Sequence, residues 1–304
     1  MTTGVGIDVS KTCLDVATSK GARWRVVNRL AGWKELAKGL AGSDIRVVME
    51  ASGGYEQGVL DYLSASSFKV FRVNARQARD FAKGLGQLAK TDRLDAGMLA
   101  QMALLVTRLT PYQPATALQR EVAQYASRRR QVVETIQRER QRIAALADPA
   151  LRQWAKRFLA SLQRQLEHID TALRTRRQAW PPIQELRRMK GAGPVLLGAL
   201  MGWVPELGRL SRREIAKLIG VAPLNDDSGQ RRGPRRIWGG RAAVRTVLYM
   251  AAPTAIRHEP AIRAMYQRLR AHGKLPKVAI VACMRKMLVI LNARARDHYC
   301  AQAA

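Results

Sequence analysis

Two aspartates three residues apart, Asp92 and Asp95, are the first candidates for chemistry in this sequence. The apolar residues that follow repeat at helical spacing, and Thr91 is a suitable N-cap, so a helix is predicted from this point. Residues three apart on a helix project from the same face. Carboxylates in a first helical turn are usually solvent-exposed partners of the helix dipole. The pair therefore indicates a site only if other acids join it.

Two such acids each close a short apolar run: Asp8 follows Gly4-Val5-Gly6-Ile7, and Glu50 follows Ile45-Arg46-Val47-Val48-Met49. Both runs are typical of short strands, and open α/β sheets carry their sites at the carboxyl ends of strands. We therefore expect four carboxylates to converge, those of Asp8, Glu50, Asp92 and Asp95. Such a cluster needs cations to offset its charge, and hard oxygen ligands favour Mg²⁺ or Mn²⁺.

The elements around these acids predict an α/β fold for the N-terminal part. The strand that ends at Asp8 precedes two more strands, at 13–19 and 23–28, which form a meander. A helix at 32–40 leads into the strand that ends at Glu50. A helix at 55–65, a strand at 69–73 and the helices with the aspartate pair complete the series. This order is that of a ribonuclease-H-like fold, in which acids from the first strand, the fourth strand and a late helix meet at one metal site.

The charge of the chain predicts a polyanionic partner. The 53 Lys and Arg against 23 Asp and Glu give a formal net charge of +30, for which nucleic acid is the default explanation. Residues 1–110 hold 16 basic and 10 acidic residues, and the remainder holds 37 and 13. No apolar run approaches about 18 residues and no signal segment is present, so we expect no membrane association but a cytoplasmic, nucleoid-associated bacterial protein. Three distant cysteines predict neither a zinc site nor a disulfide framework.

Residues 115–177 have the composition of long, charged helices. With Leu118 at a heptad d position, seven of the nine a and d positions up to Leu146 are apolar, and Asp148-Pro149 then breaks the helix. We predict a helical hairpin or coiled coil that acts as a spacer or dimer strut. Its arginine runs would normally be solvated, although here they could also follow a nucleic-acid backbone. Trp154, Trp203 and Trp238 are expected in cores rather than in base-stacking positions.

The region after Pro181-Pro182 begins with a glycine turn, Gly191-Ala192-Gly193-Pro194, which opens a helix up to Met201. This pattern is similar to a helix-hairpin-helix element, whose backbone amides can bind a phosphate. A second helix is predicted at 212–219. Glycine turns between helices are common, so the signal is of moderate specificity.

A glycine-rich, polar loop at 220–241 contains one serine, Ser228, among arginines, and precedes a helix predicted at 242–252. Without other information, Ser228 would be a turn residue after Asp226-Asp227. The functional alternative is a nucleophile whose alkoxide and target phosphate are stabilised by nearby guanidinium groups. The candidates for that stabilisation are Arg231, Arg232, Arg235, Arg236 and Arg241. The four histidines belong to no recognisable triad motif, so a Ser-His-Asp hydrolase is not expected.

Five motifs together resemble the DEDD transposases of the insertion-sequence one-ten family, which includes Piv-type DNA invertases. The resemblance covers nearly the whole chain, and the motifs occur in the family's order. It implies a RuvC-like metal-binding domain at 1–110, a coiled-coil region at 111–180 and a transposase domain at 181–304. It assigns the metal to Asp8, Glu50, Asp92 and Asp95 and the catalytic serine to Ser228, with Ser211 as the competing serine. The motifs are Gly6–Lys11, Met49–Glu56, Lys90–Ala96, Gly191–Pro194 and Ser228–Arg245.

The same resemblance implies a mechanism and partners. A structured noncoding RNA, the bridge RNA, pairs with double-stranded donor and target DNA, and the serine attacks a DNA phosphate to give a covalent phosphoserine. The RuvC-like site of another subunit completes a composite site, which implies a dimer or tetramer. Nucleic acid would be contacted by Lys190 and Arg245 in addition to the loop arginines.

Two functions from other classes remain open at this point. A RuvC-like nuclease or junction resolvase would hydrolyse DNA with metal ions and would not need Ser228. A nonenzymatic nucleic-acid-binding protein would use the carboxylates only structurally and would bind without metal. The dependence of activity on Ser228 and on metal separates the three.

Overall fold

The chain forms two compact units, Met1–Pro114 and Ala115–Ala304. The structure is a computed structural model that describes residues 2–40, 44–86, 92–224, 227–228, 231–233 and 235–303. Within these ranges the side chains of Asp92, Arg93, Leu94, Ser228, Arg231, Arg232 and Ala303 are not described. Thr91, the predicted N-cap, lies outside the described residues, as does Asp226.

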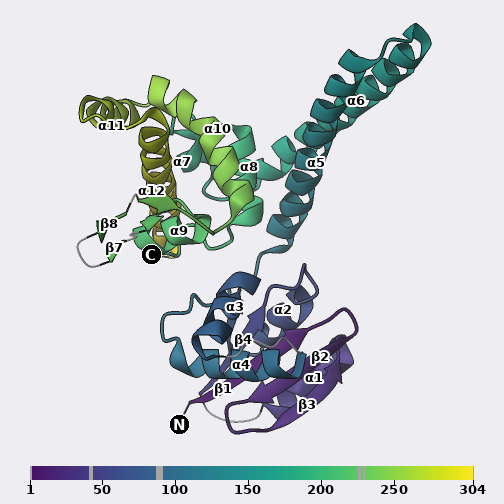
Figure 1. Ribbon diagram of the computed structural model, residues 1–304, viewed down its shortest axis with the longest axis vertical. Helices are drawn as coiled ribbons and strands as arrows, with labels where there is room; N and C mark the ends of the chain where they lie inside the picture. The colour runs from purple at the N-terminus through teal and green to yellow at the C-terminus, as the bar shows by residue number, and fades with distance from the viewer. Residues whose placement is uncertain are drawn as a thin grey trace. The chain divides into compact units, whose positions relative to one another are not determined.

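The first unit is built on a five-stranded sheet with the strand order β3-β2-β1-β4-β5 (Figure 1). The first three strands pair antiparallel, whereas β4 runs parallel to β1 and β5 runs parallel to β4. The predicted meander followed by alternating helices and strands is confirmed. The strands are β1 (Thr3–Val9), β2 (Cys13–Thr18), β3 (Arg23–Val27), β4 (Ile45–Glu50) and β5 (Lys69–Val73).

Helices cover both faces of this sheet and divide its side chains into two cores. On one face, α1 (Leu30–Gly39) and α2 (Gln57–Ala65) pack with alternate strand residues such as Ile7 and Met49. On the other, α3 (Ala75–Gly84) and α4 (Asp92–Leu105) pack with Val48 and the residues aligned with it. A strand buried on both sides loses the simple alternation of apolar and polar residues. This explains why β1 and β4 are apolar almost throughout.

The second unit begins with an antiparallel helical hairpin of α5 (Ala117–Ala145) and α6 (Pro149–Gln178). Asp148 caps α6 by accepting a hydrogen bond from the Leu151 backbone at 2.7 Å, and Pro149 occupies the first turn. The predicted break is confirmed. The two polar seam positions are ion-paired: Arg129 lies 2.6 Å from Asp170, and buried Glu139 lies 3.2 Å from Arg142.

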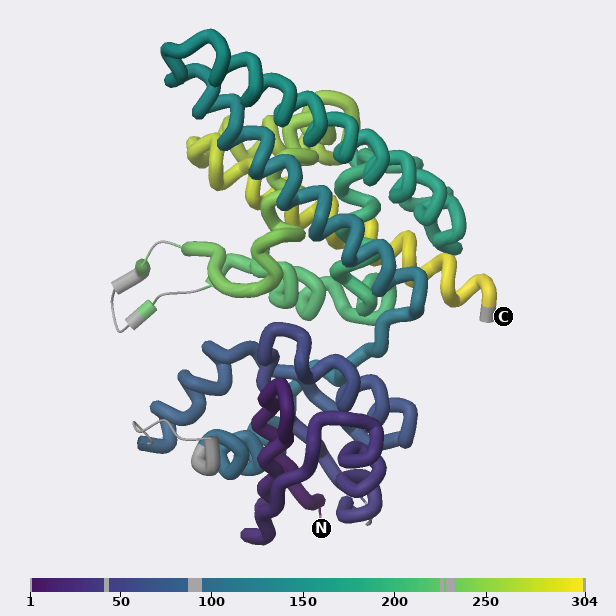
Figure 2. The backbone as a smooth tube through the Cα atoms, turned by 90° about the vertical axis from the view of Figure 1, so that its right-hand side faces the viewer, coloured from purple at the N-terminus to yellow at the C-terminus, as the bar shows by residue number. Residues whose placement is uncertain are grey.

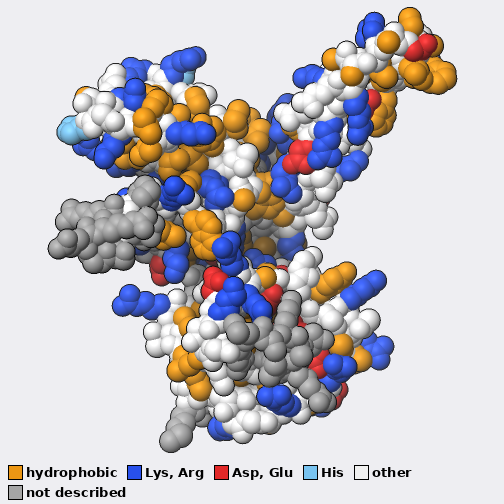
Figure 3. Space-filling view, viewed as in Figure 1, with side chains coloured by type: hydrophobic (Ala, Val, Ile, Leu, Met, Phe, Trp, Pro, Cys, Tyr) orange, Lys and Arg blue, Asp and Glu red, His pale blue; other side chains and the backbone are white. Residues whose placement is uncertain are grey.

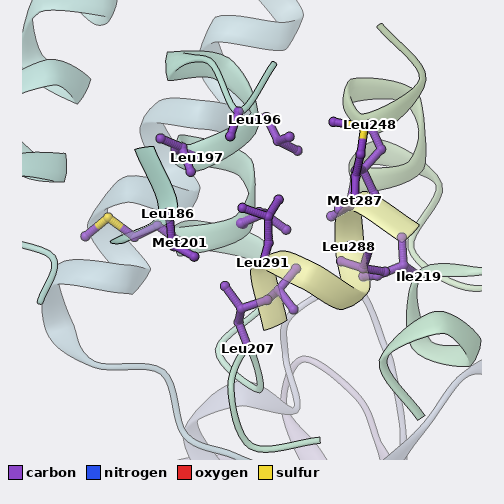
Figure 4. Packing of buried hydrophobic residues seen from close by; sticks show 14 of the residues in the cluster. Leu186, Leu196, Leu197, Met201, Leu207, Ile219, Leu248, Met287, Leu288 and Leu291 are labelled. Atoms are coloured by element: carbon purple, nitrogen blue, oxygen red, sulfur yellow. The ribbon is translucent and has the colours of Figure 1, made fainter. Parts of the chain in front are cut away.

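The remaining elements form a mainly helical body that shares one core with the hairpin. Val122 and Val132 of α5 belong to the same apolar cluster as the residues drawn in Figure 4, so this core spans the predicted boundary near residue 180. The elements are α7 (Ile183–Arg187), α8 (Pro194–Trp203), α9 (Arg212–Ile219), β6 (Pro223–Leu224), β7 (Asp227–Ser228), β8 (Arg231–Arg232), β9 (Arg236–Ile237), α10 (Ala242–His258), α11 (Pro260–Ala271) and α12 (Pro276–Ala303).

Three expectations for this unit were wrong. The helix predicted to end at Ala252 continues through Pro253 to His258, because Ala252 and Ala255 are fully buried and the core holds the chain in a helix while the proline faces outward. Trp154 and Trp238 are 64% and 50% exposed rather than core residues.

Across the described residues, no helix is long and apolar enough to cross a membrane.

Candidate active site

The register of β1 and β4 brings Asp8 and Glu50 side by side. The parallel ladder ends at the pair Ile7 and Met49, and the next residues on each strand are the two acids. Alternation along the strands puts both acids on the α4 face of the sheet, with Gly6 and Val48. Both carboxylates are half-buried. The adjacent strand ends predicted from sequence are therefore present.

Glycines in β1 let the backbone of α4 approach the same face. A Cβ on Gly4 would overlap the carbonyl oxygen of Ala100, and one on Gly6 would overlap that of Ala96. A strand advances about 6.6 Å over two residues and a helix about 6 Å over four. Every second residue of β1 on this face therefore lies near every fourth residue of α4. The next strand position on this face is Asp8, and it corresponds to the first turn of α4, which contains Asp95.

Asp95 is half-buried, and Asp92 is the first residue of α4. Among the residues that the structure describes, no three His, Cys, Asp or Glu side chains lie close enough together to hold a metal ion. Asp8 and Glu50 thus lie at one edge of the sheet and Asp95 lies in the first turn of α4, and these three side chains do not form a metal cluster by themselves. The side chain of Asp92 is not among those described.

Glu56 organises the loop after Glu50, a role that the sequence did not reveal. Its carboxylate is 3% exposed and accepts hydrogen bonds from the Ser52 backbone at 3.1 Å, the Ser52 hydroxyl at 3.1 Å and the Gly54 backbone at 2.9 Å. Arg72 of β5 lies 3.7 Å from its other oxygen. The signal available in the sequence was an acid at the end of a glycine-rich loop. The structure adds that this acid is buried, and buried carboxylates need several partners.

A further acid, Asp15, lies directly opposite Asp8 in the antiparallel pairing of β1 and β2. Like charges in this arrangement repel. Arg25 offsets the charge of Asp15 with two hydrogen bonds of 2.8 and 3.0 Å. The sequence could have indicated Asp15 only through the strand register, which was not predicted.

In the second unit, Ser228 lies in a narrow antiparallel ribbon. β6 pairs with β9, and β7 pairs with β8 so that Ser228 stands opposite Arg231. These strands extend away from the helical body of the unit (Figures 1 and 2). Arg235 donates a hydrogen bond of 2.6 Å to Asp227, which holds the pKa of that carboxyl below its usual range. Arg236 is exposed on β9.

The base of this ribbon is fixed to the body by a close backbone crossing. Gly240 has a φ of +66°, and a Cβ there would overlap the backbone of Gly220, which ends α9 with a φ of +76°. Arg245 donates to the carbonyls of Ile219, at 3.4 Å, and Gly239. The two sides of the ribbon are therefore held together where they leave the body.

The predicted nucleic-acid contacts differ in their surroundings. Arg241 donates to both carboxylate oxygens of Glu206, at 2.6 and 2.5 Å, and to the Trp203 carbonyl at 2.7 Å, so its guanidinium has a structural role. Lys190 is exposed, and its backbone amide in the glycine turn donates to Glu259 at 3.0 Å. Figure 3 shows abundant Lys and Arg side chains over the α5–α6 hairpin and the α10–α12 helices.

Two transposase family profiles match the two parts of the chain that carry these sites. A profile described as a DEDD transposase of IS110 matches residues 5–151, and one described as the transposase IS116/IS110/IS902 family matches residues 183–267. The chain belongs to the IS110 family of transposases. The first match contains the strand ends with Asp8 and Glu50, here called the carboxylate edge. The second contains the glycine turn at 191–194 and the ribbon of β6 to β9 with Ser228, here called the serine ribbon.

Relatives of this IS110-family transposase include DNA-inverting proteins. The pilin gene-inverting proteins of Moraxella bovis and Moraxella lacunata are each 25% identical, over 97% of this chain and 96% of their own. A 42 kDa protein of insertion element IS900 from Mycobacterium paratuberculosis is 30% identical over 50% of this chain and 39% of its own. The predicted enzyme class, a transposase or DNA recombinase, is confirmed.

Proposed function

We propose that this transposase cuts and rejoins DNA through a covalent phosphoserine at Ser228, supported by a divalent metal bound to Asp8, Glu50, Asp92 and Asp95. The observation that carries the proposal is the side-by-side arrangement of Asp8 and Glu50 on the face covered by α4, whose first turn holds the other two acids. The first unit would then be a RuvC-like, ribonuclease-H-like domain.

The chemistry of the donor set supports Mg²⁺ or Mn²⁺. All four candidate ligands are carboxylates, the oxygen donors that these hard cations prefer. Carboxylates on adjacent strands repel one another, and a cation between them would offset that repulsion. When bound, the metal would supply positive charge to a scissile phosphate. The described residues contribute Asp8 and Glu50 from one edge of the sheet and Asp95 from the first turn of α4.

Ser228 is the better of the two candidate nucleophiles. The hydroxyl of Ser211 caps α9: it accepts from the Glu214 backbone at 3.3 Å, while the Glu214 carboxylate accepts from the Ser211 backbone at 2.9 Å. Hydrogen bonds from Ser211, first from its side chain and then from its backbone, hold the pKa of the Glu214 carboxyl below its usual range. Such a reciprocal cap commits Ser211 to helix structure. Ser228 instead lies on a ribbon among arginines.

In the proposed step, the Ser228 oxygen attacks a DNA phosphorus and displaces the hydroxyl of one strand. The new phosphorus–oxygen bond replaces the broken one, and the leaving strand oxygen takes up the proton that serine gives up. A hydroxyl of the joining strand later displaces serine in the reverse sense. Phosphodiester energy is conserved, so no external energy source is needed. The arginines around the ribbon would stabilise the charged phosphate.

We infer that the partners are donor DNA, target DNA and a structured noncoding bridge RNA. The net charge of +30 supports more than one polyanion on the protein at once. The carboxylates belong to one compact unit and Ser228 to the other. This division supports a dimer or tetramer in which the two half-sites come from different subunits.

A covalent-adduct assay tests this function. The protein is mixed with DNA spanning the element's junction, its flanking RNA and Mg²⁺, and is then run on a denaturing gel. We expect a DNA-linked protein band that disappears on chelation, in Asp8→Asn and in Ser228→Ala, but persists in Ser211→Ala. Cut DNA without an adduct, unchanged in Ser228→Ala, would instead identify a RuvC-like nuclease. Binding of nucleic acid without any metal-dependent cleavage would identify a nonenzymatic protein.

A further inference from the structure

Asn28 connects the two loops that follow the carboxylate-bearing strands. It lies directly after β3, and its side-chain amide donates to the carbonyl of Ser10 at 2.8 Å and to that of Tyr55 at 3.1 Å. Ser10 stands two residues after Asp8, and Tyr55 stands five residues after Glu50. One half-buried side chain therefore joins two segments that are far apart in the sequence.

The orientation of this amide is itself fixed. The Asn28 carbonyl oxygen accepts a hydrogen bond of 3.0 Å from the Trp33 indole, so the amide nitrogen must point toward the two loops. Trp33 is held in turn against α2, because a Cβ on Gly58 would overlap its ring. The site needs two donors and one acceptor on a short side chain, a combination that asparagine supplies and aspartate does not.

Each of the two loops that Asn28 joins has hydrogen bonds of its own. Fixing the spacing of the two loops therefore also fixes the spacing of the strand ends before them. The Ser10 backbone donates to the Cys13 carbonyl at 3.0 Å in the turn after β1. The buried Glu56 carboxylate holds the loop after β4 through Ser52 and Gly54. The ladder between β1 and β4 ends at Ile7 and Met49, one residue before the two acids. The bonds of Asn28 lie beyond that end.

We propose that Asn28 is a positioning residue that fixes the spacing of the Asp8 and Glu50 carboxylates and thereby sets the affinity for divalent metal. This role rests on the proposed metal site. Two carboxylates on adjacent strands repel each other, and the bonds of Asn28 add a tie beyond the β1–β4 ladder that limits their separation when no cation is bound. Groups that orient metal ligands without touching the metal commonly change affinity by about 10–100-fold.

Titration of the full-length protein with Mn²⁺, followed by electron paramagnetic resonance, tests the proposal. We expect Asn28→Ala to weaken Mn²⁺ binding by about 10-fold or more. Asn28→Asp has nearly the same shape and keeps the acceptor for Trp33, but it places a carboxylate oxygen against two carbonyls, so we expect a similar loss. This second variant keeps the test decisive if the alanine variant folds poorly.

Asn74→Ala is a matched control in the same unit. Asn74 caps α3 by accepting a 2.7 Å hydrogen bond from the Gln77 backbone, away from both loops. We expect Asn28→Ala and Asn74→Ala to lower the metal-free unfolding temperature by similar amounts, about 3 °C. Only the Asn28 variants should lose Mn²⁺ affinity.

The outcomes separate this role from the metal site on which it rests. Unchanged Mn²⁺ affinity in both Asn28 variants, with normal weakening in Asp8→Asn, would overturn the positioning role and leave the metal site intact. Equal losses of affinity in Asn28→Ala and Asn74→Ala would also overturn it, since general loosening would then be the cause. No saturable Mn²⁺ binding by the unsubstituted protein would overturn the metal site and the role together.

Discussion

The carboxylate edge of the first unit and the serine ribbon of the second differ in how their residues are held. The edge belongs to a five-stranded sheet covered on both faces, and its loop is anchored by a carboxylate that is 3% exposed. The ribbon consists of two-residue strands, and Leu224 and Trp238 along it are 47% and 50% exposed. A two-stranded hairpin has little stability of its own in water.

This contrast indicates where each half of the proposed chemistry acquires its geometry. At the edge, the register of β1 and β4 fixes the strand positions of Asp8 and Glu50. In the ribbon, the contacts with the helical body that the described residues show lie at the base, at the backbone crossing of Gly220 and Gly240 and the Arg241–Glu206 pair. Under the proposed function, nucleic acid bound to the arginines would add contacts to the exposed residues of the ribbon, such as Arg236.

The largest expected effect is a loss of stability at the carboxylate edge, in the variant Gly6→Ala. The added Cβ would overlap backbone atoms of Ala96 and Ala100, so α4 must move off β1. We expect the free energy of unfolding of the first unit to fall by about 3 kcal/mol, measured by calorimetry. The control Gly84→Ala adds a Cβ at a position with no atom within 4 Å and should change little. Equal effects of the two variants would contradict close backbone packing at Gly6.

The anchor at the base of the ribbon is tested by Arg241→Ala. Its removal leaves the Glu206 carboxylate, with a side chain only 10% exposed, without its main partner. We expect a loss of about 3 kcal/mol from the second unit in chemical denaturation, at the lower end for a broken buried pair. Arg236→Ala, on the exposed strand β9, should leave stability nearly unchanged. Similar losses would mean that the base is not held by this pair.

The loop anchor at the edge is tested by Glu56→Gln. The substitution removes the charge that attracts three donors and can turn an amide N–H toward the Ser52 and Gly54 backbone amides. We expect a loss of about 2 kcal/mol, the scale of hydrogen bonds to a charged group. Glu35→Gln, at an exposed position of α1, is the control. Thermal unfolding of both variants makes the comparison, and indistinguishable curves would exclude the anchoring role.

The smallest effect is expected in the ribbon, at Asp227. The hydrogen bond from Arg235 lowers the pKa of this carboxyl in the folded protein. The pair therefore contributes to stability above the unfolded pKa of Asp227, and the contribution disappears as pH falls through the lower, folded pKa. In a carbon-13 NMR titration, Arg235→Ala should return the Asp227 pKa toward its ordinary value. An unchanged pKa would place the cause elsewhere.

Sequence patterns predicted the elements of the first unit well because its strands are short, apolar and bounded by glycine or polar residues. The predicted strands that end at Glu50 and Val73 match the structure. The break at Asp148-Pro149 was equally readable, since a capping acid and a proline act locally. Two strand-end acids therefore came from sequence alone.

The rest depends on contacts that no local pattern encodes. Pro253 lies inside a helix because buried neighbours on that helix outweigh its local cost. Arg241 and Arg236 look alike in the sequence, yet one is bonded to Glu206 and the other is exposed. Asn28 and Glu56 acquire their roles from partners that the register and the turns bring close.

Because the backbone crosses itself at Gly220 and Gly240, the exposed ribbon that follows could be replaced by another without a change in the helical body. The chain leaves and re-enters the helical body at one point, so the body is closed with or without a particular ribbon. Ribbons of different length or arginine content could be transplanted from related enzymes between Pro223 and Gly240, which leaves the buried Val221 in the core of the body. Substrate preference and the stability of the helical body could then be altered separately, in evolution or by engineering.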